Sequence, residues 1–495
     1  MNSISSDFIA ANRRFWQKYQ ENDTSDLLLV DTSYHAVINH SNAVVAKMVA
    51  QAKNLRIAWL RYDNTDEDLM RSYCENSIFL SFKKFAFSKR LLFLSQAIYY
   101  YMTCVFFAYR IRSFKYKGIP YDDFIYDSYL AHFSMATLHR FDIRMIKAFY
   151  ILILKDEQSR ALLTNNNIKA VLVAHYIWTD SGPLSRVAMQ KNIPLYWKGG
   201  GRGAVNLSVY TDLKDRYDYP RRQSLNEVNL LATQHKKRME DDFQRLISQQ
   251  FSSCYTVFSV GYNNKVSSDI TRARFLKEMK LEDKPLIFIF LHAFNDYPMS
   301  HFNSMLFKDY YDLFIQTHRY ALKDRTKNWI FKDHPSSKMY PTKDLNLSNV
   351  FKNSPAHIKF LPHDSPINAS AVLNIADLIV TCVGTAGIEM PALAGIPTLV
   401  AGKTFYDRLG FNLDPCSKEE YFQILKDFSP ARISGEKQML AKCCFLYLAE
   451  YVSIPFAAGP MISYEEYFGN QDKLLRAYLE KIIDGYKEKD RKSVV

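Results

Sequence analysis

Short apolar runs recur along the chain, and most of them are only as long as a single strand. Runs of this length that are rich in Val, Ile, Leu and Phe are typical of strands buried on both faces, as in parallel sheets. Stretches with helical spacing, such as Leu138 to Lys155, separate the runs. The pattern predicts an α/β chain. The expected strands are Leu27–Asp31, Arg56–Trp59, Ala170–Ala174, Ile193–Trp197, Ile287–Leu291, Trp329–Lys332, Ile358–Leu361, Leu378–Thr381 and Thr398–Ala401.

The order of these runs divides the chain near residue 270. We expect residues 1–270 to form one Rossmann-like domain, enlarged by a helical stretch at Leu69–Arg112. Residues 271–440 are expected to form a second Rossmann-like domain, and residues 441–495 a C-terminal helical segment. A chain of 495 residues with 48% hydrophobic and 23% charged residues is long and apolar enough for two such domains.

Polar clusters follow three of the strands expected in the second domain. The clusters are His292–Asp296, Lys332–Ser336 and Gly384–Glu389, and each begins where an apolar run ends. In an open parallel sheet, ligands bind beyond the carboxyl ends of the strands. We therefore expect the three clusters to converge on one crevice.

The third cluster has the features of a phosphate site. Gly384 and Gly387 allow a tight turn, and the helix that follows offers N–H groups and a positive dipole end. These glycines, Thr385 and Ala386 are therefore candidates for binding a nucleotide phosphate, and Glu389 is placed for ribose hydroxyls. The alternative interpretation is a helix cap followed by a solvated carboxylate. The sequence favours a nucleotide-sugar site.

Several short motifs resemble the Kdo transferases of bacterial capsule and lipopolysaccharide synthesis. They are His292-Ala293-Phe294-Asn295-Asp296, Lys332-Asp333-His334-Pro335, Gly384-Thr385-Ala386-Gly387-Ile388-Glu389 and Gly402-Lys403-Thr404-Phe405-Tyr406. A further motif at Gly118–Asp127 resembles a recurring element of related surface-carbohydrate proteins. The likeness therefore covers residues 115–410.

This resemblance implies a GT-B-like enzyme with two Rossmann-like domains facing a central crevice. The family transfers Kdo from CMP-Kdo with retention, and an aspartate matching Asp296 is thought to be its covalent nucleophile. A double displacement needs such a group beside the anomeric carbon. The residues leave a second interpretation open, because Asp is also a favoured N-cap and a helix is expected around Pro298.

Other polar residues complete the expected site. His334 is placed to donate a hydrogen bond to the leaving phosphate or the donor carboxylate, and Lys332 to neutralise the charge of the CMP leaving group. In the first domain, Asp180, Ser181 and Arg186 follow an expected strand and are candidates for contacting the acceptor sugar or the donor carboxylate.

The formal net charge of +13 is compatible with nucleic acid, anionic lipid or an anionic sugar donor. Nucleic acid is not expected, because the chain has no zinc-finger spacing, RNP-like aromatic pattern or helix-turn-helix signature. Contact with an anionic membrane fits an enzyme that extends a lipid-linked glycan. The candidate basic segments are Ser81–Arg90, Arg110–Lys117 and Lys487–Lys492.

Residues 91–108 are apolar over nearly the length of a spanning helix. Polar residues interrupt them, and three consecutive tyrosines lie at their centre. Because tyrosine prefers the membrane interface to the hydrocarbon, we expect a buried or surface-docked helix instead of a spanning one.

The sequence predicts neither a bound cofactor nor disulfide bonds. No Asp-x-Asp pair follows a strand, so we expect neither a metal nor another cofactor besides the CMP-sugar co-substrate. The seven cysteines form no Cys-x-x-Cys pair and are expected to be reduced. The first residues are polar and unlike a signal peptide, which predicts a cytoplasmic protein, with a possible location at the inner face of the inner membrane.

The predicted function is transfer of a Kdo-type ulosonic acid from a CMP-sugar to a glycan or lipid-linked glycan of a capsule, O-antigen or lipopolysaccharide. Two rival functions remain open. A nucleotide-sugar epimerase of the GT-B type would use the same crevice for UDP elimination chemistry. A non-catalytic scaffold of a glycan assembly complex would keep the fold but lose Asp296 or His334, and the chain has both.

Overall fold

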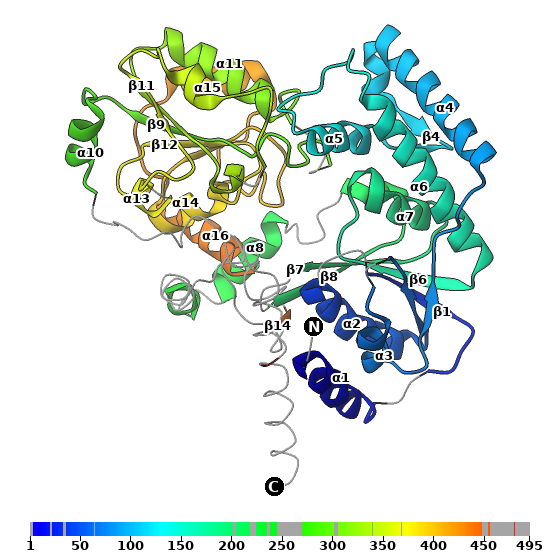
Figure 1. Ribbon diagram of the computed structural model, residues 1–495. Coiled ribbons are helices and arrows are strands. Elements are labelled where there is room, and N and C mark those ends of the chain that lie inside the picture. Colours follow the sequence, from blue (N-terminus) through cyan, green and yellow to red (C-terminus); the bar gives the residue numbers. More distant parts are fainter. Residues whose placement is uncertain are drawn as a thin grey trace. The chain divides into compact units, whose positions relative to one another are not determined.

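The chain forms two compact units (Figure 1), seen in a computed structural model. Unit 1 comprises residues 1–125, 140–216 and 453–495, and unit 2 comprises residues 126–139 and 217–452. The structure describes residues 3–19, 22–32, 36–63, 65–200, 204–217, 224–234, 238–244, 270–300, 305–338, 340–367, 369–447, 454–455 and 480. The expected basic segment Lys487–Lys492 lies outside the described residues. So does the expected C-terminal helical segment 441–495, apart from residues 441–447, 454–455 and 480.

Unit 1 is built on a seven-stranded sheet in the order β14-β8-β7-β6-β1-β2-β3. The strands from β7 to β3 pair in parallel, whereas β8 and β14 pair antiparallel. The central strand β1 is buried at every position, as its uninterrupted apolar run predicts. The strands are β1 (Leu27–Asp31), β2 (Arg56–Leu60), β3 (Ile78–Leu80), β6 (Ile168–Val173), β7 (Leu195–Gly200), β8 (Ala204–Tyr210) and β14 (Ile454–Pro455), with a separate hairpin of β4 (Lys115–Tyr116) and β5 (Ile119–Pro120).

Helices cover this sheet and enlarge the unit. The expected helical stretch at Leu69–Arg112 is helical only in part, because β3 interrupts it. The long helices α4 and α6 pack against each other, and both belong to unit 1. The helices are α1 (Ser3–Trp16), α2 (Ala36–Lys53), α3 (Glu67–Tyr73), α4 (Phe87–Phe106), α6 (Met145–Asn165) and α7 (Trp178–Gln190), with short 3-10 turns η1 (Ala108–Ser113) and η2 (Leu213–Tyr217).

Unit 2 is built on a five-stranded sheet in the order β11-β10-β9-β12-β13, and every pairing is parallel. All five expected strands are present. They are β9 (Leu286–Phe290), β10 (Asn328–Lys332), β11 (Ile358–Leu361), β12 (Leu378–Thr381) and β13 (Thr398–Val400). The α/β class with two Rossmann-like units is therefore confirmed.

The helices of unit 2 flank this sheet (Figure 1). Asp309 caps the start of α11, where its side chain accepts the Asp312 N–H. The helices are α8 (Leu225–Gln234), α10 (Arg272–Met279), α11 (Tyr310–Lys323), α12 (Leu347–Phe351), α13 (Ala369–Val372), α14 (Ala386–Ala394), α15 (Lys418–Asp427) and α16 (Gly435–Leu446), with the 3-10 turn η3 (Pro335–Lys338). Helix α5 (Asp122–Phe133) begins in unit 1 and ends in unit 2.

The strand orders define one switch point in each unit. In unit 2 the chain passes from β9 outward to β11 and then returns to β12 on the other side of β9. In unit 1 the same reversal occurs between β1 and β6. The carboxyl ends of the strands flanking each switch point are the places where such sheets bind ligands.

Two features of the loops differ from the expectation. Among the described residues up to 300, no helix begins around Pro298, since residues 294–296 and 298–300 form turns and bends. The interpretation of Asp296 as an N-cap therefore has no helix to cap in this part of the structure. The unit boundary near residue 216 also lies earlier in the chain than the expected division near residue 270.

Candidate functional site

A stack of three rings lies at the switch point of unit 2. His292, at the end of β9, packs its ring face on Tyr310 at 4.4 Å between centroids and 15° between planes. The His334 ring lies 6.4 Å from the His292 ring between centroids, with 12° between their planes. His292 Nε2 accepts the N–H groups of Cys382 and Val383, both at 3.3 Å. Because an accepting Nε2 carries no proton, His292 joins the ends of β9 and β12 as a neutral ring.

Lys332 and His334 occupy the carboxyl end of β10. Burial lowers the pKa of Lys332 to about 8. Burial, with a smaller effect of Lys332, lowers the pKa of His334 to about 4. At neutral pH this strand end therefore presents a mostly charged ammonium and an uncharged imidazole. Asp333 fixes the turn between them by accepting the His334 N–H at 2.8 Å and the Ser337 hydroxyl at 2.6 Å.

Asp296 lies in the turn that follows β9. Its N–H donates to the Ala293 carbonyl at 3.0 Å, which holds the backbone of the turn. Its Oδ1 is buried and has no hydrogen-bond partner among the described residues. Burial raises the pKa of Asp296 to about 7, and the Asp296 charge contributes to raising the pKa of Tyr310. A carboxyl group with an unsatisfied buried oxygen therefore sits near the ring stack.

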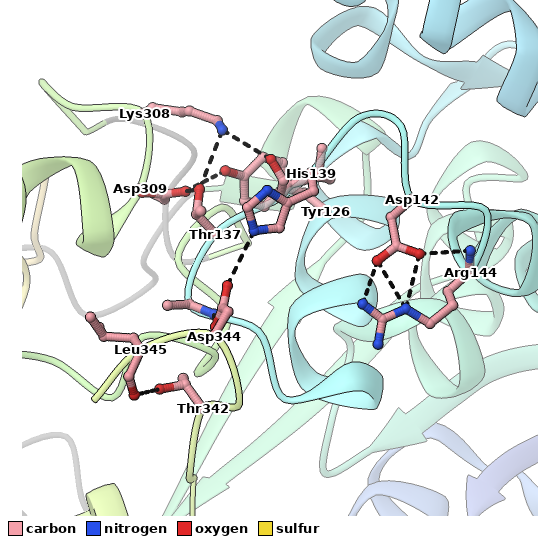
Figure 2. Close-up of polar contacts among 12 residues, drawn as sticks. Tyr126, Thr137, His139, Asp142, Arg144, Lys308, Asp309, Thr342, Asp344 and Leu345 are labelled. Atoms are coloured by element: carbon pink, nitrogen blue, oxygen red, sulfur yellow. Dashed lines mark hydrogen bonds and ion pairs between the residues drawn. The ribbon is translucent and has the colours of Figure 1, made fainter. Parts of the chain in front are cut away.

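The loop that carries Asp296 is fastened by the Gly118–Asp127 motif. The Asp127 carboxylate accepts the N–H groups of Met299 and Ser300 at 3.0 and 2.6 Å. Two residues of the same part of the chain, Tyr126 and Thr137, donate to Asp309 Oδ2, as Figure 2 shows. This part of the motif therefore positions the site loop and the start of α11.

The turn before α14 is shaped by internal contacts. The N–H groups of Gly387 and Ile388, two of the expected phosphate donors, already bond the carbonyls of Gly384 and Thr385. An ideal Cβ on Gly387 would lie 2.3 Å from the Tyr406 hydroxyl oxygen, which itself donates to the Gly384 carbonyl. Only glycine fits this place, because Tyr406 packs directly beneath the turn.

Glu389 is buried in α14, with 4% of its surface exposed. Its charge contributes to raising the pKa of Tyr406. The alternative of a solvated carboxylate is therefore wrong. Whether Glu389 binds ribose hydroxyls stays a prediction, as do the roles expected for Thr385 and Ala386.

A pocket of about 340 Å³ opens at the carboxyl end of β13. It contains two cations, Lys403 and Arg408, and burial raises the pKa of Asp414 in its wall to about 6. The volume is within the range of small-molecule sites. Its lining residues are Leu306, Val400, Gly402, Lys403, Asp407, Arg408, Asp414, Pro415 and Cys416.

A second polar cluster lies at the switch point of unit 1. His175 follows β6, and burial with the nearby Lys198 lowers its pKa to about 4. Lys198 is buried in β7, where burial lowers its pKa to about 7 and its ammonium donates to the Ser41 hydroxyl at 2.5 Å. Burial lowers the pKa of Lys155, while Asp180 and Asp31 oppose the shift. Charged groups of both signs therefore gather around the ends of β1, β6 and β7.

Aromatic side chains surround this cluster. The Tyr62 hydroxyl donates to Asp31 Oδ1 at 2.9 Å, and Lys155 lies 4.7 Å above the Phe82 ring. Trp178 stacks on His175 at 5.7 Å and holds a left-handed backbone with φ of 66°. Strained backbone of this kind concentrates at functional sites. Flat aromatic faces beside charged groups suit a polar ring such as a sugar.

The three expected acceptor residues have different placements. Asp180 is exposed and acts on the charges of the unit 1 cluster. The Ser181 hydroxyl donates to the Ile177 carbonyl at 2.6 Å. Arg186 is buried in an ion pair with Asp123 at 2.5 Å, away from solvent. Arg186 is therefore built into the core of unit 1, which corrects its expected place at a binding surface.

Sequence reasoning assigned no individual role to three residues of these clusters: His292, Tyr310 and Asp31. His292 stands at the start of a motif that was noticed, and its position directly after a strand was the signal. Tyr310 gave no signal, because a tyrosine in a helix looks like an ordinary structural residue until the fold places it.

Within the described ranges, no group of three or more His, Cys, Asp or Glu side chains is placed to hold a metal ion. The expected independence of metals stays a prediction. In the part of the chain that the structure describes, none of the helices combines the length and the apolar character needed to cross a membrane.

Comparison with known proteins gives weak likenesses. No protein-family model matches the chain, and no curated protein matches it in sequence. Among solved structures, MurG of Acinetobacter baumannii is 10% identical over 94% of both chains, with a TM-score of 0.22. UDP-GlcNAc 2-epimerase from Neisseria meningitidis bound to UDP-GlcNAc is 10% identical over 94% of this chain and 99% of its own, with a TM-score of 0.18. The spinosyn rhamnosyltransferase SpnG is 9% identical over 93% and 96%, with a TM-score of 0.21. Scores this low carry no inference about function.

Proposed function

We propose that the protein is a retaining glycosyltransferase that moves a Kdo-type ulosonic acid from a CMP-sugar to a surface-glycan acceptor. The observation that supports this proposal is that the adjacent parallel strands β9 and β10 end at the same edge of the sheet, where the turn after β9 carries Asp296 and the end of β10 carries Lys332 and His334. The α14 turn follows β12, on the other side of β9. A nucleophile, a cation and hydrogen-bond donors for the phosphate are the parts that this reaction requires.

The first step uses the carboxylate form of Asp296. An Asp296 oxygen forms a bond to the anomeric carbon, while the bond from that carbon to the CMP phosphate breaks and its electron pair leaves with the phosphate. Lys332 neutralises the departing charge, and neutral His334 donates one N–H to the phosphate or the sugar carboxylate. The transition state resembles an oxocarbenium ion, which the nearby negative charge stabilises.

The second step restores the enzyme. An acceptor hydroxyl attacks the anomeric carbon, the ester bond to Asp296 breaks, and the hydroxyl proton passes to solvent. Two inversions give net retention.

The decisive experiment traps the covalent intermediate. Protein incubated with CMP-Kdo or CMP-sialic acid, without acceptor, should release CMP and gain the mass of one sugar on the peptide that contains Asp296. Asp296→Asn should lose turnover and the adduct but keep CMP binding. Asp364→Asn, at an exposed position of unit 2, is the matched control and should behave as wild type. A fully active Asp296→Asn variant would remove Asp296 from the mechanism.

Nucleotide binding separates this proposal from its rivals. CMP but not UDP should raise the melting temperature, since a ligand that binds only the folded state stabilises it. Glu389→Ala and Thr385→Ala should weaken that effect, because losing a charge-assisted hydrogen bond costs about 1.5–3 kcal/mol. Stabilisation by UDP alone would favour an epimerase, and stabilisation by neither nucleotide would favour a scaffold.

A further inference from the structure

One face of helix α4 packs against the rest of unit 1. Phe93, Ala97, Tyr101 and Cys104 are buried, and their spacing places them on one side of the helix. This side packs against α6, and the two helices run next to each other in Figure 1. Tyr100 extends the contact by packing its ring against Phe149 of α6. The buried side therefore fixes how α4 lies on the unit.

The opposite face of α4 is apolar and exposed. Its side chains recur at helical spacing, and between 39% and 74% of their surface is open. Scattered exposed apolar residues are normal, but a continuous stripe along a whole helix marks an interaction surface. The stripe, called here the α4 stripe, consists of Phe87, Leu91, Leu94, Ile98, Met102 and Phe106.

Two residues from elsewhere in unit 1 extend this surface. The Tyr101 hydroxyl donates to the Phe141 carbonyl at 3.0 Å, which places the 141–143 turn beside the C-terminal half of α4. The side chains of Phe141 and Ile143 are 67% and 69% exposed. The apolar surface is therefore wider than a single helix.

The charge of the segment that carries the stripe has one sign. Residues 81–117 contain eight lysines and arginines and no aspartate or glutamate. Lys83, Lys84, Lys89 and Arg90 are exposed at the N-terminal end of α4, and Arg112 is exposed beyond its C-terminal end. An apolar stripe between basic ends is the composition of helices that lie in the interface of an anionic membrane.

We propose that the α4 stripe rests on the surface of an anionic lipid bilayer, with the helix axis parallel to the membrane. The apolar side chains enter the boundary between headgroups and acyl chains, and the basic ends contact the anionic headgroups. The axis cannot turn to span the bilayer while the other face is buried against α6. A second copy of the chain is a poor occupant, because it would bring two acid-free basic segments together.

Vesicle sedimentation of the full chain tests this proposal. The protein should pellet with vesicles containing about one third phosphatidylglycerol, bind neutral phosphatidylcholine vesicles at least about tenfold less, and detach as salt rises to a few hundred millimolar. Ile98→Glu with Met102→Glu should reduce binding by about tenfold or more, and Ile98→Ser with Met102→Ser should reduce it less. Leu322→Glu, at an exposed leucine of unit 2, should bind as wild type.

Charge reversal tests the basic end separately. Lys83→Glu with Lys84→Glu should weaken binding to anionic vesicles, whereas Lys277→Glu with Lys352→Glu changes the net charge equally and should not. Unchanged binding in both stripe variants would overturn the proposal. So would a concentration-dependent dimer that the stripe variants dissociate. CMP release from a soluble donor should stay unchanged in all these variants, so this proposal can fail without the proposed function failing.

Discussion

The buried carboxyl of Asp296 makes the stability of unit 2 depend on pH. The folded pKa of about 7 lies above the ordinary value of 3.8, because burial disfavours the charged form. A group with a raised folded pKa contributes stability that is full below its unfolded pKa and is lost as pH rises through its folded pKa. The gap between the two values corresponds to about 4 kcal/mol.

Part of this contribution is already lost at pH 5, where the unfolded carboxyl is ionised. Integration of the two titrations leaves about 2.5–3 kcal/mol to be lost between pH 5 and pH 9. For a unit of this size, that loss lowers the melting temperature by about 5–12 °C. Lys332 and His334 have lowered pKa values and act in the opposite direction, so the wild-type profile alone does not isolate Asp296.

Comparison with Asp296→Asn isolates the group. The amide keeps the size of the side chain but does not titrate, so the variant should become more stable relative to wild type by about 2.5–3 kcal/mol as pH rises from 5 to 9. Thermal unfolding of both proteins, with Asp364→Asn as the exposed control, measures this difference. A constant difference across that range would show that Asp296 is solvated and ionised throughout, and the proposed protonation behaviour would be refuted.

Two core contacts give further predictions. Gly387→Ala should destabilise unit 2 by about 1–3 kcal/mol in thermal or denaturant unfolding, because the new methyl group meets the Tyr406 hydroxyl at 2.3 Å, whereas Gly435→Ala, with no atom within 4 Å, should be nearly neutral. An unchanged unfolding curve for Gly387→Ala would show that the ring moves freely. Arg186→Met should cost about 3–5 kcal/mol in unit 1, since it leaves Asp123 buried without its partner, and adding Asp123→Asn should restore part of the loss. Additive costs in that double variant would contradict the pairing.

The strands could be predicted from the sequence because they are buried on both faces. Strand β1 of unit 1 and strands β9 and β12 of unit 2 are runs of apolar residues that are almost entirely buried, and such runs have few other uses in a globular chain. Strand β8 was missed for the opposite reason. Val205, Leu207 and Val209 alternate with polar residues, which is typical of a half-exposed antiparallel strand that a search for continuous runs passes over.

The site could be predicted only where its residues follow a strand directly. His334, Asp296 and Gly384 belong to polar clusters that follow strands, and the parallel topology places these clusters at one edge of the sheet. Arg186 looked equally available in the sequence, yet its guanidinium also bonds the Pro120 carbonyl at 2.8 Å and packs 4.3 Å from the Phe124 ring. Such contacts join residues that are distant in the chain, and no local sequence pattern predicts them.

The direction of the pKa shifts separates Asp296, Lys332 and His334 from a paired carboxylate such as Glu157, although the pKa of Asp156, which pairs with Arg160, is also raised by burial. Burial would raise the pKa of Glu157, but the hydrogen bond from Lys117 lowers it, so a partner within the chain stabilises the charged form. For Asp296, Lys332 and His334 the shift goes toward the neutral form in every case. The free protein therefore holds these groups where their charged forms lack sufficient stabilisation. A ligand that brings an anionic phosphate to Lys332 and an electrophilic carbon to Asp296 supplies the missing partners, which is the physical reason to expect a ligand at this edge of the sheet.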